Sequence, residues 1–102
     1  MNEELSPKTK QLLASIQDEA IRAGVMEIFE SKPALYAPPS AEVLERVRFA
    51  VIKLALQGPK MLKLAAKFYE EDTRDLLVSA EFGLDPDSDK AWAEAVIKKE
   101  NA

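Results

Sequence analysis

The sequence contains no cysteine and no histidine among its 102 residues. Without cysteine, the chain cannot form a disulfide, a thiolate nucleophile, an iron–sulfur cluster or a zinc finger. Without histidine, it has no Ser-His-Asp triad, no imidazole ligand for a metal and no side chain that ordinarily titrates near neutral pH. These absences exclude the commonest catalytic and metal-binding arrangements.

Long apolar runs and strand signals are also missing. The run Phe49–Ile52 has four residues, whereas a membrane-spanning helix needs about 20. The sequence has no Asn-Gly or Asp-Gly pair and no sustained alternation of apolar and polar residues, so nothing indicates a β-hairpin. The first residues, Met-Asn-Glu-Glu-Leu, are acidic, where a secretory signal would be basic. We therefore expect a cytoplasmic protein that does not enter a membrane.

Apolar residues make up 47% of the chain and charged residues 31%. At this length they suffice for one domain with one modest core. Because the apolar residues recur at helical spacing, the sequence predicts an all-α fold, a compact bundle of five to six short helices. We expect residues 1–102 to form this single domain, with residues 1–5 disordered, and we expect no cofactor and no metal.

Cap residues and prolines divide the chain into helices. The first prediction is a helix over residues 7–23, a break or bend at Gly24 and a short helix to Glu30, with one long two-faced helix as the alternative. Proline-rich residues 32–40 form an extended connection, which ends at the cap residue Ser40, and Gly83 stops a later helix. The further predicted helices cover residues 41–57, 60–70, 73–82 and 89–100.

Several apolar residues lie away from the main apolar face of their helices. A broad stripe runs along residues 41–57, and Phe49, Ile52 and Leu56 form a second stripe on the other side. A helix that is apolar on two sides is either central to a bundle or half of an interface. Tyr69 and Trp92 are better explained as core anchors. The candidate interface residues are Phe49, Ile52, Leu56, Val78 and Phe82.

Charge is distributed unevenly, although the net charge is only −4. Residues 46–67 contain six basic residues and no acid, and residues 70–89 contain eight acids and one base. Neighbouring helices could neutralise each other, or the dipolar surface could steer a partner or a second copy into register. The third interpretation is binding of phosphate or nucleic acid. The candidates for that basic patch are Arg46, Lys53, Lys60, Lys63 and Lys67.

No motif in the sequence predicts chemistry. The segment Asp85–Asp89 resembles the start of an EF-hand calcium loop, but Lys90 and Val96 stand where that loop needs glycine and glutamate. No serine lies in a Gly-x-Ser-x-Gly turn. We therefore predict no catalytic residues. The expected function is protein–protein association as a homodimer, and phosphate or nucleic-acid binding through residues 46–67 is the alternative.

The stretch from Arg46 to Leu77 resembles short bacterial all-α proteins that form a domain family of unknown function. The matching pieces are Arg-Phe-Ala-Val-Ile-Lys-Leu-Ala-Leu-Gln-Gly and Asp-Thr-Arg-Asp-Leu-Leu, and together with the residues between them they cover about a third of the chain. The resemblance implies a bacterial, cytoplasmic protein. It implies no activity, cofactor or site residue.

Overall fold

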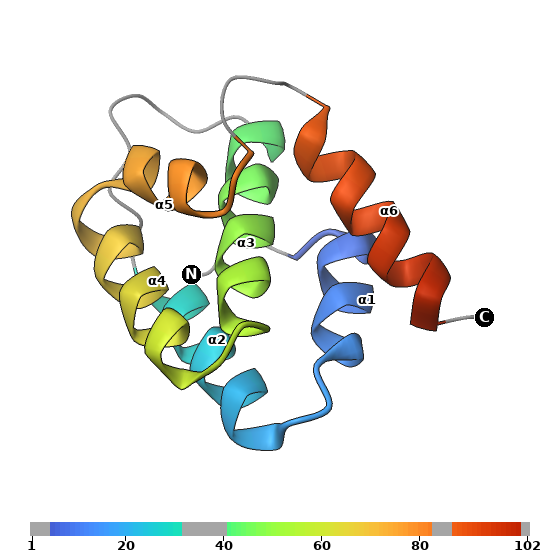
Figure 1. Ribbon diagram of the computed structural model, residues 1–102, viewed down its shortest axis with the longest axis horizontal. Coiled ribbons are helices and arrows are strands. Elements are labelled where there is room, and N and C mark those ends of the chain that lie inside the picture. The colour runs from blue at the N-terminus through green and yellow to red at the C-terminus, as the bar shows by residue number, and fades with distance from the viewer. Residues whose placement is uncertain (1–4, 32–40, 83–86, 101–102) are drawn as a thin grey trace.

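The computed structural model describes residues 5–31, 41–82 and 87–100. In these ranges the chain forms six α-helices and no strand, which confirms the predicted all-α bundle of five to six helices (Figure 1). The helices are α1 (Pro7–Ser15), α2 (Glu19–Glu30), α3 (Ala41–Ala55), α4 (Pro59–Glu71), α5 (Thr73–Ser79) and α6 (Ser88–Glu100).

Short polar side chains start three of the helices. The Ser6 hydroxyl accepts a hydrogen bond from the backbone N–H of Thr9, and Pro7 follows it at the first helical position. Asp72 caps α5 through the N–H of Arg74. Such caps satisfy backbone donors that have no partner within the helix. The sequence predicted both of these starts.

The first helix does not reach Gly24, so the predicted helix over residues 7–23 is wrong, and so is the alternative of one long helix. The chain instead leaves the helix at Ile16, and the Asp18 carboxylate starts α2 by accepting bonds from the N–H groups of Ala20 and Ile21. Gly24 lies inside α2, where a Cβ atom would sit 2.7 Å from Cδ2 of Leu62 in α4. The glycine therefore permits close approach of two helices rather than a turn.

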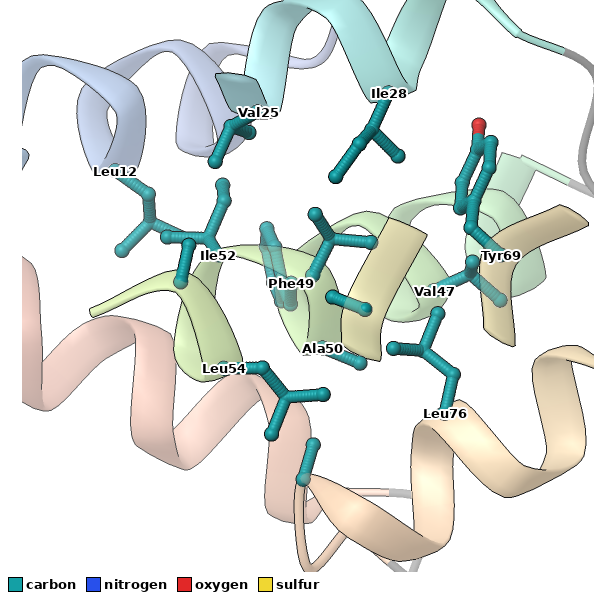
Figure 2. Close-up of a cluster of buried hydrophobic side chains, with 14 of the residues drawn as sticks. Leu12, Val25, Ile28, Val47, Phe49, Ala50, Ile52, Leu54, Tyr69 and Leu76 are labelled. Atoms are coloured by element: carbon teal, nitrogen blue, oxygen red, sulfur yellow. The ribbon is translucent and has the colours of Figure 1, made fainter. Parts of the chain in front are cut away.

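The two-sided helix α3 is the centre of the bundle. It packs against α1, α2, α4, α5 and α6 (Figure 1). Residues of both stripes, among them Val51, Leu54, Phe49 and Ile52, have no exposed surface. In Figure 2, Ile52 and Leu54 leave α3 in opposite directions and both remain inside the cluster. Of the two interpretations of this helix, the central one is correct.

The other helices surround α3. Helix α4 packs on α3 and is flanked by α2 and α5, whereas α6 contacts α1 and α3. Within the described ranges, none of these helices has the length and apolar character that crossing a bilayer requires. Predictions for residues 1–4, for the connection 32–40 with its cap Ser40, and for Gly83 lie outside the described residues. Leu5 packs against the core.

Helix α5 ends earlier than predicted, through a residue that is not glycine. Glu81 adopts a positive φ of 65°. The N–H groups of Glu81 and Phe82 bond to the carbonyl oxygens of Val78 and Leu77. This is the Schellman arrangement, in which glycine usually occupies the left-handed position. The turn directs Phe82 back into the core, where it is 2% exposed.

We predict that Glu81→Gly stabilises the protein. A residue with a Cβ atom destabilises the folded state by about 1 kcal/mol when it adopts the left-handed conformation, and glycine does not. Urea unfolding should therefore show a gain of about 0.5–1 kcal/mol. The control is Ala23→Gly at an exposed position inside α2, which should lose about 1 kcal/mol. A loss of stability in Glu81→Gly would contradict this explanation of the turn.

Candidate functional site

Three of the five candidate interface residues belong to the core of the single chain. Phe49 and Ile52 have no exposed surface and Phe82 has 2%, so the prediction that they line an association surface is wrong. Helix α6 covers the two phenylalanines, because Trp92 packs on both with ring centroids 6.3 Å from Phe49 and 5.9 Å from Phe82. Ile52 lies instead beside Leu12 of α1 and Val25 of α2 (Figure 2). Leu56 remains exposed at 45%, and so does Val78 at 69%.

A glutamate substitution distinguishes the buried candidates from the exposed ones. Ile52→Glu places a charge in the core and should cost more than about 4 kcal/mol, enough to unfold a small domain. Val78→Glu should change stability by less than about 0.5 kcal/mol, because the side chain is exposed. Circular dichroism with urea titration measures both. Retention of full helicity and stability by Ile52→Glu would show that its site is a surface.

The basic residues of the predicted patch are not brought together. Arg46 and Lys53 lie at the Phe82 ring, with Cζ of Arg46 5.8 Å and Nζ of Lys53 5.1 Å from its centroid. These two cations therefore stabilise the fold through the face of an aromatic ring. Lys60, Lys63 and Lys67 are exposed on α4. The five-residue basic patch is thus reduced to three lysines on one helix.

Arg46 also forms the most buried ion pair that the structure shows among its described residues. Its Nη1 atom lies 2.7 Å from Oδ1 of Asp89, and its Nη2 donates to the carbonyl oxygen of Phe82 at 3.2 Å. The Ser88 hydroxyl donates to the same carbonyl oxygen at 2.7 Å. These contacts join α3 to the end of α5 and the start of α6. We call Arg46, Phe82, Ser88 and Asp89 the clasp.

The clasp takes one of the eight acids of residues 70–89 out of solvent. The Asp89 side chain is only 5% exposed. Its Oδ1 atom accepts a hydrogen bond from Nη1 of Arg46. No group of three or more acidic side chains within residues 5–31, 41–82 and 87–100 is placed to hold a metal ion. Part of the charge asymmetry is therefore neutralised inside the fold.

Removing one member of the clasp should destabilise the protein more than removing a surface ion pair. Asp89→Ala leaves the Arg46 charge buried and should cost about 3–5 kcal/mol, whereas Arg46→Met combined with Asp89→Leu should recover most of this loss. The control is Glu94→Ala in the same helix, whose contact with Lys8 is exposed and contributes less than about 1 kcal/mol. Urea unfolding measures all three. Equal costs for Asp89→Ala and Glu94→Ala would contradict the role of the clasp.

A second buried cation lies on α3, and sequence reasoning did not select it. Arg48 is 5% exposed, and its Cζ atom lies 5.7 Å from the centroid of Phe29. Burial raises the pKa of the Tyr69 hydroxyl, and the charge and hydrogen bond of Arg48 offset part of this rise. Tyr69 is 1% exposed, which confirms it as a core anchor. The signal in the sequence was an arginine between apolar residues of a helix with two apolar sides.

The outer face of α4 is a further candidate surface, in addition to the exposed Leu56 and Val78. Of the thirteen residues of this helix, only Ala65 and Tyr69 are buried, and α4 lies at the left edge of the molecule in Figure 1. The outer face carries charged residues together with one half-buried leucine. Its residues are Lys60, Lys63, Leu64, Lys67, Glu70 and Glu71.

Comparisons of the chain with protein-family models, with curated proteins and with solved structures give no match. The resemblance to short bacterial helical proteins therefore stays a prediction. The function has to be inferred from the surface itself.

Proposed function

We propose that the protein acts through protein–protein association, as a homodimer, and that it carries no catalytic activity. The observation that carries this proposal is the outer face of α4. It combines exposed charges of both signs with the half-buried Leu64, and it is flanked by Met61 and Phe68, which pack partly against the core. Complementary charge around a small apolar centre is typical of a surface that selects and orients a partner.

Lys60, Lys63 and Lys67 support the second candidate function, which is binding of phosphate groups. All three are exposed along one edge of α4. However, Glu70 and Glu71 follow on the same helix, and Arg46 and Lys53 are engaged at the Phe82 ring. Phosphate binding needs an excess of positive charge, so the mixed face favours a protein partner.

The oligomeric state in solution tests the proposal. Sedimentation velocity and light scattering over a concentration series should show the mass rising from that of one chain, 11.3 kDa, towards twice that value. Added salt should shift the transition to higher concentration, because exposed charges are screened. A mass of one chain at every concentration, together with salt-sensitive retention on heparin, would favour phosphate binding instead.

A further inference from the structure

The outer face of α4 has the spacing of a coiled-coil seam. Lys60, Leu64, Lys67 and Glu71 follow one another at intervals of four, three and four residues, so they form a line along one side of the helix. The buried residues Ala65 and Tyr69 point to the core. The seam therefore lies on the side of α4 that faces away from the core, where Lys60, Lys67 and Glu71 are exposed and Leu64 is half-buried.

Charge along this seam changes sign from one end to the other. Lysines occupy its first part and a glutamate its end, and Glu70 lies beside that end. A parallel copy would place lysine against lysine. An antiparallel copy related by a two-fold axis near Ala65 places Lys60 opposite Glu71, and Leu64 opposite the apolar stem of Lys67.

In the same register, the residues on either side of the seam also face complementary residues of the second copy. In an antiparallel pair of helices, positions on the same flank meet each other. On one flank Lys63 then faces Glu70 of the second copy. On the other flank the half-buried Met61 faces Phe68 of the second copy. One register therefore pairs opposite charges and apolar side chains, and it places no exposed lysine against another lysine.

We propose that a second copy of this chain docks its α4 antiparallel on α4, with Lys60–Glu71 and Lys63–Glu70 pairs formed twice across the axis. This inference rests on the proposed homodimer and specifies its interface. Thirteen residues give a helix of about 20 Å. One helix pair of this length buries less than the roughly 800 Å² per partner of a standard interface. The dimer should therefore be weak and salt-sensitive.

Charge reversal at the seam tests this interface. Lys60→Glu and Glu71→Lys should each weaken self-association about tenfold or more, because each creates two like-charge contacts in the symmetric dimer. An equimolar mixture of the two variants should form a heterodimer, in which every contact is again between opposite charges. The double variant, Lys60→Glu with Glu71→Lys, should also recover the dimer. Sedimentation velocity measures all four samples, and circular dichroism checks their folding.

Reversals on other helices provide the controls. Lys10→Glu on α1 and Glu30→Lys on α2 also change exposed residues, and they should leave the dimer within about threefold of the wild type. If the wild type dimerises and neither seam reversal weakens it, or if the mixture of variants fails to associate, the antiparallel interface is wrong while the proposed homodimer stands. If the wild type stays monomeric at every concentration, both are wrong.

Discussion

Helix α3 lies at the centre of the bundle, and the other five helices depend on it because each of them packs against it. Glu42 near its start is exposed, but the charges on the enclosed part of the helix must find a partner inside the fold. Arg46 pairs with Asp89, Arg48 lies between Phe29 and Tyr69, and Lys53 lies on the Phe82 ring. A buried charge without such contacts would cost more than the net stability of a small domain.

Enclosure of α3 decides which surfaces are left for a partner. The second apolar stripe packs against neighbouring helices of the same chain, so Phe49 and Ile52 contribute to stability and not to association. The basic run is divided as well, because its α3 members face inward and its α4 lysines face outward. Besides the exposed Leu56 and Val78, what remains for a partner is the outer face of α4, a helix that packs against α2, α3 and α5 on its other side.

Periodicity and cap residues predicted most of the helices, because a helix start is a local event that a serine or aspartate determines. Other features depend on contacts distant in sequence. The second apolar stripe of residues 41–57 shows that this helix has two apolar sides, but it does not show whether other helices of the same chain cover the second side. From the sequence alone Gly24 predicts a helix break or bend. Its actual role, which is to let Leu62 of α4 approach closely, depends on a residue that is distant in sequence. Burial of Asp89 likewise follows from Arg46, which is 43 residues away.

Amide hydrogen exchange, measured across a dilution series, tests the central claim that α3 is enclosed within one chain. The account predicts that the backbone amides of residues 49–52 exchange only by global unfolding even in the monomer, at concentrations below that at which the protein dissociates. Dimerisation stabilises the folded state as a whole, so dilution lowers the protection of all globally exchanging amides by the same factor. Amides of residues 49–52 that exchange by local opening in the monomer, well before the slowest amides of the chain, would show that a second chain covers α3, and would contradict the account.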